Sequence, residues 1–418
     1  MHVDVVVLGA GIAGLGAALK AREQNKNYII FEANKRAGGL LDNFEIQGFR
    51  FDNAVHLSFA SEPEVRKIFD QTQYHTHPAD AWNFEIDKWL KHPVQNNLFP
   101  LSASEKLELI KSFINRSDLK GEDYESWLRH QYGDSISERY PIRYTQKYWD
   151  TPASKLSTTW IGNRMRRAEL DEILYGAFTP ETPNTYYTKE MRYPKKGGYR
   201  AFIEPLISDS KIEYNHKACN IDLEKKIVSF TNGQIVQFNT LISSIPLPEL
   251  VSITNNVHED VVNASKSIVA TSIDLVSVGF NKPLVKDLWF YIYDEDILAS
   301  RAYSPSVKSP DNVPDGCSSL QFEIYTRGKD SKYTKEQLIH NTLYALKKMK
   351  IANDTDILFT HHKHLPYGNV IFDQGMEVKR DVVRKFYNVQ GVKTIGRFGE
   401  WKYLWSNQSF MSGYNVSL

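Results

Sequence analysis

Short apolar runs and helical patterns alternate at the start of the chain. Residues 3–8 form a largely apolar, β-branched run that leads into glycine, and Ile12, Leu15 and Leu19 then recur at spacings of three and four residues. The first pattern is typical of a buried parallel strand, and the second of an amphipathic helix. A second short apolar run follows at 28–31. We therefore predict a strand–helix–strand unit here.

Helical patterns dominate residues 61–190. Ser102 and Glu105 precede an apolar periodic stretch, which predicts a capping box at the start of a helix. Residues 124–132 carry a helical pattern that stops at Gly133, and glycine is typical of helix ends. Further helices are predicted at 136–149 and 164–175.

Strand patterns return after residue 190. Strands are predicted at 211–214, 218–223, 227–230, 235–238, 240–244, 268–280, 288–293, 319–324 and 392–395. Helices are predicted at 199–208, at 335–348 and from Asn407 onward. Because 418 residues exceed the usual size of a single core, more than one domain is expected.

The predicted fold is α/β, with a Rossmann-type dinucleotide-binding domain, a helical insertion and a second, mixed β-sheet for the substrate. The dinucleotide-binding domain is expected to be discontinuous, because its strand patterns resume after the helical region. The predicted limits are 1–60, 191–250 and 390–418 for the dinucleotide-binding domain, 61–190 for the insertion, and 251–389 for the substrate-binding sheet.

The composition is that of an ordinary globular protein. Hydrophobic residues make up 41% and charged residues 24% of the chain, and 51 basic residues stand against 50 acidic ones. This balance leaves no field that would attract a nucleic acid. No apolar stretch is long enough to cross a membrane, and the first strand begins at Val3, which leaves no room for a signal peptide. We therefore expect a cytoplasmic protein without a membrane span.

Cysteine usage argues against metal and disulfide chemistry. Cys219 and Cys317 are too few for a disulfide framework or a zinc site. We expect free thiols and no metal. No feature of the sequence predicts an oligomeric state.

Three glycines follow the first strand in the spacing of a dinucleotide site. Gly9 permits a tight turn, Gly11 lets the backbone approach a pyrophosphate, and Gly14 lets the helix pack on the strand. The helix N-terminus then directs its amides at the phosphates. Glu32 ends the second strand, where its carboxylate would accept hydrogen bonds from ribose hydroxyls and repel a ribose phosphate. The strand, the helix and the acid together predict a dinucleotide pocket.

The next motif distinguishes between dinucleotides. Arg36, Gly38, Gly39 and Leu40 form an Arg-x-Gly-Gly-Leu segment. It resembles the second glycine pair of FAD-binding flavoproteins related to amine oxidases, protoporphyrinogen oxidases and UDP-galactopyranose mutases. The resemblance implies that FAD is the cofactor and that this pair lies against its pyrophosphate.

The same resemblance draws attention to His56. It lies in a segment that runs near the flavin ring in this family, which makes it a candidate catalytic residue. The sequence supports equally well the alternative that His56 is only hydrogen-bonded beside the cofactor. Relatives commonly have glycines just before this histidine, whereas Asn53, Ala54 and Val55 precede it here.

The centre of the chain resembles UDP-galactopyranose mutases and their protoporphyrinogen-oxidase-like kin. Residues 144–156 match the mutase pattern Tyr-Thr-x-Lys-x-Trp-Gly-x-x-Pro-x-x-Leu, with Asp150 in place of the glycine and one residue fewer before the proline. The resemblance implies that an arginine and tyrosines in the following segments grip a substrate diphosphate and its uridine. These segments contain Arg164, Arg166, Arg167, Tyr186 and Tyr187. We favour Arg164, and a solvated basic helix face is the alternative.

Two later segments extend the resemblance. Residues 288–293, followed by Arg301, resemble a mutase strand after which a second arginine reaches the diphosphate. Residues 396–408 closely match the signature Gly-Arg-x-Gly-x-Tyr-x-Tyr-x-Asp-Met-x-Gln, with Trp401 in place of the first tyrosine. The signature implies a substrate contact from Tyr403. It implies contacts to the cofactor from Gly396, Arg397, Asn407 and Gln408.

Departures from the pattern bear on the substrate. Trp405 and Ser406 replace the Asp-Met pair of the mutases, so we expect a sugar other than UDP-galactose. Tyr367 falls where relatives have a substrate-lining tyrosine, and a buried loop aromatic is the alternative.

Three functions are considered. The first is a mutase-like flavoenzyme for a nucleotide-linked sugar in cell-surface polysaccharide synthesis, in which reduced flavin N5 attacks the anomeric carbon and an external reductant supplies the reduced flavin. The second is an FAD-dependent oxidase of an amine or a protoporphyrinogen-like substrate. The third, a catalytically silent flavin-binding scaffold, has little support. The arginine-rich segments favour an anionic small-molecule substrate.

Overall fold

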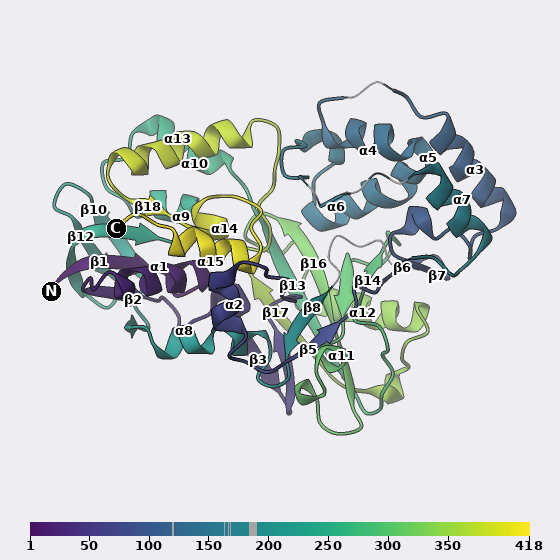
Figure 1. Ribbon diagram of the computed structural model, residues 1–418, viewed down its shortest axis with the longest axis horizontal. Helices are drawn as coiled ribbons and strands as arrows, with labels where there is room; N and C mark the ends of the chain where they lie inside the picture. The colour runs from purple at the N-terminus through teal and green to yellow at the C-terminus, as the bar shows by residue number, and fades with distance from the viewer. Residues whose placement is uncertain (119–120, 163, 166, 168, 184–189) are drawn as a thin grey trace.

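The computed structural model describes residues 1–418 except 119–120, 163, 166, 168 and 184–189. Figure 1 shows a sheet near both termini, a group of helices at the opposite end, and a second sheet below that group. Short 3₁₀ turns occur at Gly39–Leu41, Val94–Asn96, Ala153–Lys155, Tyr199–Ile203, Pro310–Asn312 and Asp354–Asp356.

The first sheet contains both ends of the chain. Its strands run in the order β10-β11-β12-β1-β2-β9, with β18 beside β12. β1 pairs in parallel with both β2 and β12. The strands are β1 (His2–Leu8), β2 (Tyr28–Phe31), β9 (Ile212–Glu213), β10 (Ala218–Asp222), β11 (Ile227–Phe230), β12 (Ile235–Ser243) and β18 (Lys393–Thr394). The two strands predicted at 235–238 and 240–244 are thus one continuous strand.

Helices cover both faces of this sheet. Val5 and Val7 of β1 point into the core beneath α1 (Ile12–Glu23) and α15 (Ser406–Tyr414). Val6 points to the opposite core, which receives side chains from the helical insertion and also from three helices outside it. Those helices are α9 (Leu247–Ser252), α10 (Glu259–Ser267) and α13 (Met376–Val389). Further helices of this region are α2 (Pro63–Phe69), α8 (Glu204–Ser208) and α14 (Gly396–Gly399).

α1 is not the amphipathic helix that its spacing predicted. It is buried on nearly all sides, because α15 packs against the face that does not contact the sheet. A methyl group on Gly16 would lie 2.6 Å from the Phe410 carbonyl oxygen, and one on Gly413 would overlap the Ala13 carbonyl oxygen. These glycines let the two helices approach closely.

The second sheet also has seven strands among the described residues. Its order is β17-β13-β16-β15-β14-β6-β7. The strands are β6 (Ala81–Glu85), β7 (Lys88–Lys91), β13 (Thr271–Phe280), β14 (Trp289–Ile292), β15 (Arg301–Tyr303), β16 (Ser318–Arg327) and β17 (Ile357–Leu365). The helices α11 (Pro305–Lys308) and α12 (Lys335–Lys348) accompany it. Two small sheets pair β3 (Asn43–Ile46) with β4 (Phe49–Asp52), and β5 (Tyr74–His77) with β8 (Met191–Pro194).

Residues 74–91 depart from the mainly helical pattern predicted for 61–190. They form β5, β6 and β7, and β6 pairs in parallel with β14 of the second sheet. Phe84 of β6 pairs with Ile292 of β14, which lies 208 residues further along the chain. Such long-range pairing decides strand formation in a way that a local pattern does not.

The helices of the insertion follow β7. They are α3 (Ala103–Ile114), α4 (Tyr124–Tyr132), α5 (Asp134–Ser137), a π-helical turn (Glu138–Ile142), α6 (Arg143–Trp149) and α7 (Leu170–Phe178). The capping box of Ser102 and Glu105 is confirmed, as is the helix end at Gly133. The helix predicted at 164–175 was placed too early, since α7 begins at Leu170. Among the described residues, no helix is long and apolar enough to cross a membrane.

Candidate functional site

A cavity of about 1010 Å³ lies where the three regions meet. Its lining includes Gly9 and Glu32 from the first sheet, Tyr144 from the helical group, and Tyr291 and Arg301 from the second sheet. This volume lies at the upper end of the range for pockets that enclose small molecules.

The first glycine turn forms one end of the cavity. Gly9 has a φ of +94°, which permits the turn out of β1, and a methyl group on Gly14 would overlap the Gly9 carbonyl oxygen. A methyl group on Gly11 would meet no heavy atom within 4 Å. Gly11 lines the cavity and Gly14 does not. Gly14 therefore serves helix–strand packing, whereas Gly11 leaves space for a ligand.

The second glycine pair lies beside the first turn. The Gly38 amide donates to the Ala10 carbonyl at 2.9 Å. Gly38 and Gly39 have φ values of +119° and +58°, and a methyl group on Gly39 would lie 3.5 Å from the Gly11 Cα. Gly38, Gly39 and Leu40 all line the cavity. Two glycine backbones thus meet at the place where a pyrophosphate would lie.

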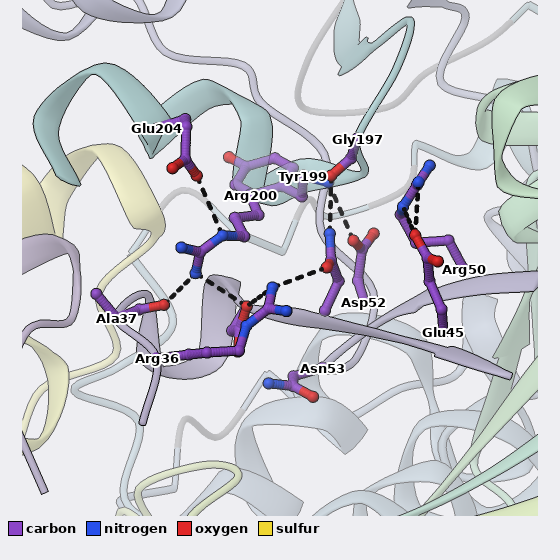
Figure 2. A network of polar contacts seen from close by, with 12 residues as sticks. Arg36, Ala37, Glu45, Arg50, Asp52, Asn53, Gly197, Tyr199, Arg200 and Glu204 are labelled. Atoms are coloured by element: carbon purple, nitrogen blue, oxygen red, sulfur yellow. Dashed lines mark hydrogen bonds and ion pairs between the residues drawn. The ribbon is translucent and has the colours of Figure 1, made fainter. Parts of the chain in front are cut away.

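Charged side chains brace this second turn from outside (Figure 2). Arg200 donates to the Ala37 carbonyl and, at 2.9 Å, to Asp42, and it pairs with Glu204 at 3.1 Å. Arg36 donates to the same Asp42 carboxylate at 2.9 Å, is half exposed, and is not among the lining residues. The structure thus places Arg36 as a brace of the turn rather than at the cavity surface.

Glu32 is fixed at the edge of the cavity. One of its carboxylate oxygens accepts from the Ala10 amide at 2.8 Å, and the other accepts from the Asn34 amide and side chain at 2.9 and 2.8 Å. Only 7% of the residue is exposed. A carboxylate has further acceptor sites for ribose hydroxyls. The Glu32 carboxylate and the glycine cradle therefore fit a dinucleotide with a free ribose.

His56 lines the cavity at the end of an unusual turn. Its Nδ1 lies 3.1 Å from the Ala54 carbonyl oxygen, and its ring packs on Tyr199 at 5.3 Å between centroids. Burial, followed by the positive charges of Lys308 and Arg397, lowers the pKa of His56 to about 3. The imidazole is therefore neutral at neutral pH, which suits a hydrogen-bonding role.

Ala54 adopts the left-handed conformation that glycine would favour, with a φ of +81°. For a residue with a side chain this conformation costs on the order of 1 kcal/mol, and the surrounding contacts must supply that energy.

Arg301 and Tyr403 meet in the cavity wall through Tyr148. The Tyr148 and Tyr403 hydroxyls lie 2.9 Å apart, and the Arg301 guanidinium lies 5.3 Å from the centre of the Tyr148 ring. Arg301 forms an ion pair with Glu323 and donates to the Tyr325 hydroxyl at 3.0 Å. Burial lowers the pKa of Arg301, but the charge of Glu323 together with the surrounding tyrosines raises the pKa well above its usual value.

Arg164 joins the same wall from a bend, not from a helix. Its guanidinium donates to the Trp160 carbonyl at 2.9 Å and to the Tyr403 carbonyl at 2.7 Å. It also lies 4.8 Å from the ring centres of both Tyr403 and Trp405. Arg164, Arg301 and Tyr403 are therefore brought together. Arg166, Tyr186 and Tyr187 lie outside the described residues.

Some residues of the C-terminal signature line the cavity, and others support it from behind. Gly396 and Arg397 line the cavity. The Arg397 guanidinium donates to the Leu404 carbonyl at 2.9 and 2.7 Å, which fixes the loop that carries Tyr403. Asn407 donates to Glu62, and Gln408 accepts from the Trp405 amide at 3.0 Å as part of a capping box. Asn407 and Gln408 are not among the lining residues.

Several other residues take positions that their motifs did not reveal. Tyr367 does not line the cavity, since its hydroxyl donates to Glu249 at 2.7 Å. Lys147, in the mutase-like segment, donates to the Ile292 and Asp294 carbonyls at 2.8 Å and ties α6 to the second sheet. Sequence reasoning missed Glu323. Its signal was an acidic residue inside the strand predicted at 319–324, where polar and apolar residues alternate.

Comparisons with known proteins agree with this geometry. Residues 12–372 match the family described as flavin containing amine oxidoreductase. A solved structure of reduced UDP-galactopyranose mutase has a TM-score of 0.92 at 23% identity, over 99% of this chain and 94% of that chain. A putative protoporphyrinogen oxidase from Exiguobacterium sp. 255-15 has a TM-score of 0.73 at 16% identity, over 98% of this chain and 97% of that chain. At these identities the likenesses establish the fold.

A curated relative matches over a shorter stretch. Protoporphyrinogen oxidase 2, chloroplastic/mitochondrial, of Arabidopsis thaliana is 29% identical over 110 residues, which are 26% of this chain and 21% of that protein. The chain thus matches about a fifth of the length of this relative. The family match, by contrast, covers most of the chain. Since the glycine cradle and Glu32 also fit a dinucleotide, the chain belongs to the flavin containing amine oxidoreductases, and it is an enzyme whose cofactor is FAD.

Proposed function

We propose that this protein is a mutase-like flavoenzyme that acts on a nucleotide-linked sugar in the synthesis of cell-surface polysaccharide. The observation that carries the proposal is the meeting of Arg164, Arg301 and Tyr403 in the same cavity as the glycine cradle. A bound FAD would extend from Glu32 towards His56, and a second ligand would then lie between the flavin and these three residues.

The charges of the cavity support an anionic substrate. Arg164, Arg167, Arg301 and Arg397 line it, and Glu32, at the opposite end, is the one acidic residue among its described lining residues. Arginine pairs well with phosphate oxygens because its donors are arranged in a planar fork. A diphosphate placed near Arg164 and Arg301 would be held there, and the same positive charges would stabilise it as a leaving group.

Aromatic side chains support the nucleoside and sugar parts of such a substrate. The described lining includes Tyr124, Tyr132, Tyr140, Tyr144, Tyr148, Trp149, Trp160, Tyr291 and Tyr293. These rings offer flat apolar surfaces, and the tyrosines add hydroxyls that can bind ring substituents. When bound and reduced, the flavin would supply a nucleophilic nitrogen for the anomeric carbon, and the chain would hold the two reactants together and exclude water.

The alternative is an FAD-dependent oxidase of an amine or a protoporphyrinogen-like substrate. The aromatic wall would suit a flat ring system, and the arginines would suit its carboxylates. For a simple amine, the four lining arginines are unfavourable, because they repel a cationic substrate.

A redox balance distinguishes the two functions. The purified holoenzyme, with its flavin either reduced or oxidised, is incubated with a panel of UDP- and dTDP-sugars and, separately, with an amine and a protoporphyrinogen. The products and hydrogen peroxide are measured. We expect turnover of a nucleotide sugar by the reduced enzyme only, with no net electron transfer per product. Stoichiometric peroxide from a non-nucleotide substrate, together with no binding of any nucleotide sugar, would establish the oxidase instead.

A further inference from the structure

Glu323 connects the proposed anion site to the turn beside the cofactor. The residue is fully buried on β16. One carboxylate oxygen, Oε2, pairs with Arg301 and accepts from the Tyr325 hydroxyl at 2.7 Å. The other, Oε1, accepts from the Val55 backbone amide at 2.7 Å. One carboxylate therefore holds both a cationic wall residue and the backbone next to His56.

The contacts of Arg301 limit how it can bind a ligand. Its Nε is used by Glu323, and its Nη2 donates to the Tyr325 hydroxyl. Its Nη1 has no hydrogen bond to any of the described residues, and Arg301 lines the cavity. An anion would thus engage Nη1, while Glu323 holds the opposite edge of the same guanidinium.

The turn at residues 53–56 is held by contacts on both sides. Ala54 has a φ of +81°, a strained value for a residue with a side chain. The Ala54 amide donates to the Asp52 carbonyl at 3.0 Å, and the Val55 amide donates to Glu323. Asn53, Ala54, Val55 and His56 all line the cavity. A strained turn persists only while such contacts hold it, so a change at Glu323 is transmitted to it.

We propose that Glu323 is a positioning residue that couples the binding of an anion at Arg301 to the conformation of the His56 turn. An anion competes with Glu323 for the charge of Arg301 and repels the Glu323 carboxylate. The Glu323 carboxylate then interacts less with Arg301 and more strongly with the Val55 amide, and the turn moves with it. Because coupling between two sites is reciprocal, a change of the turn also alters the affinity for the anion. The inference rests on the proposed function in that Arg301 receives an anion.

The test measures anion binding and the state of the turn separately. Oxidised holoenzyme is titrated with inorganic pyrophosphate and, in parallel, with UDP. Calorimetry gives the affinity, and the visible absorbance of the flavin reports on its surroundings. The variants are Glu323→Gln, which removes the charge, and Ala54→Gly, which relaxes the turn without touching Arg301.

A matched control comes from β6, a strand of the same sheet that is separated from β16 by β15 and β14. Glu85 is also a buried acid that pairs with an arginine, Arg139, at 2.6 Å, and it accepts from the Tyr140 hydroxyl at 3.2 Å. It has no hydrogen bond to the described residues of the 53–56 turn. Glu85→Gln therefore has a similar effect on a buried ion pair but leaves the turn and Arg301 in place.

We expect pyrophosphate and UDP to shift the flavin spectrum of the wild type and of Glu85→Gln equally. In Glu323→Gln, the affinity for the anion should rise about tenfold because a like charge near the anion is removed. The spectral shift at saturation should fall to less than about a third of the wild-type shift, since the contact between residue 323 and the turn is weakened. Ala54→Gly should bind within about twofold of the wild type, because its pocket charges are unchanged, and should also lose most of the shift. It keeps the test open if Glu323→Gln fails to fold.

Contrary results separate this inference from the proposed function. A full spectral shift in Glu323→Gln or in Ala54→Gly overturns the coupling and leaves the function standing. A pyrophosphate response without UDP binding counts against the nucleotide-sugar function and supports the coupling. If neither anion binds the wild type, both are wrong.

Discussion

Two glycines of the first turn, Gly11 and Gly14, should respond differently to the same small change. Gly11→Ala and Gly14→Ala each add one methyl group to adjacent turns of the same motif. On Gly14 the methyl group would overlap the Gly9 carbonyl oxygen and lie 3.4 Å from a Val7 methyl group. On Gly11 it would meet no protein atom within 4 Å, and Gly11 has an ordinary φ of −73°.

The structure gives the size of each effect. Gly14→Ala forces α1 away from β1, and we expect the free energy of unfolding to fall by about 3 kcal/mol, at the upper end of overpacking costs. Gly11→Ala should change the stability of the cofactor-free protein by less than about 1 kcal/mol, because its φ suits alanine. Its methyl group instead occupies the place of the pyrophosphate. One hydrogen bond lost to a charged group costs about 1.5–3 kcal/mol, which corresponds to a Kd for FAD about 10- to 150-fold higher.

Two measurements on each variant test this reasoning. Urea denaturation of the cofactor-free protein gives the stability, and quenching of FAD fluorescence gives the affinity. Gly11→Val serves as a larger step at the same position and should abolish FAD binding while the protein remains folded. The reasoning fails if Gly11→Ala binds FAD as tightly as the wild type, or if it destabilises the cofactor-free protein as much as Gly14→Ala does.

Three further predictions concern the charged residues. Arg301→Met should lower the free energy of unfolding by about 3–5 kcal/mol, because it leaves the buried Glu323 charge unpaired; chemical denaturation measures this, and an unchanged midpoint would contradict it. Arg164→Ala should weaken binding of a nucleoside diphosphate by about 1.5–3 kcal/mol, measured by calorimetry, with flavin content retained. The control Arg129→Ala removes exposed ion pairs of α4 and should leave this binding unchanged. Burial lowers the pKa of His56 from its ordinary value of 6.5 to about 3 in the folded protein. The unfolded chain therefore binds the proton first as the pH falls below 6.5, and about 1–2 kcal/mol of stability should be lost between pH 7 and pH 5; His56→Asn should lack this loss, and equal urea midpoints at both pH values for the wild type would refute it.

The sequence predicted features whose signals are local. The turn from β1 into α1 needs Gly9 at positive φ, and the helix ends at Ser102 and Gly133 satisfy their own backbone groups. These choices depend on neighbouring residues only, so spacing and residue type are sufficient to predict them. The same applies to Glu32, whose place at the end of β2 follows from the length of one strand–helix–strand unit.

Features that depend on distant partners were decided by the tertiary structure. β6 forms because β14 lies beside it, and α1 is buried all round because α15 covers it. No pattern within 81–85 or 12–23 contains that information, since a strand or helix face is stabilised by whatever packs on it.

The candidate site shows the same division. Motif resemblance indicated Arg36, Asn407 and Gln408 as cofactor contacts. In the structure their side chains form hydrogen bonds with Asp42, Glu62 and the Trp405 amide, and none of the three is a lining residue. Sequence analysis missed Glu323 because an acidic residue in a strand of alternating polar and apolar residues does not reveal its partners. Sequence by itself determined the backbone that receives the cofactor, because glycine conformations are local. Only the tertiary structure decided which charges face the cavity, because a buried charge must be paired, and its partner can lie anywhere along the chain.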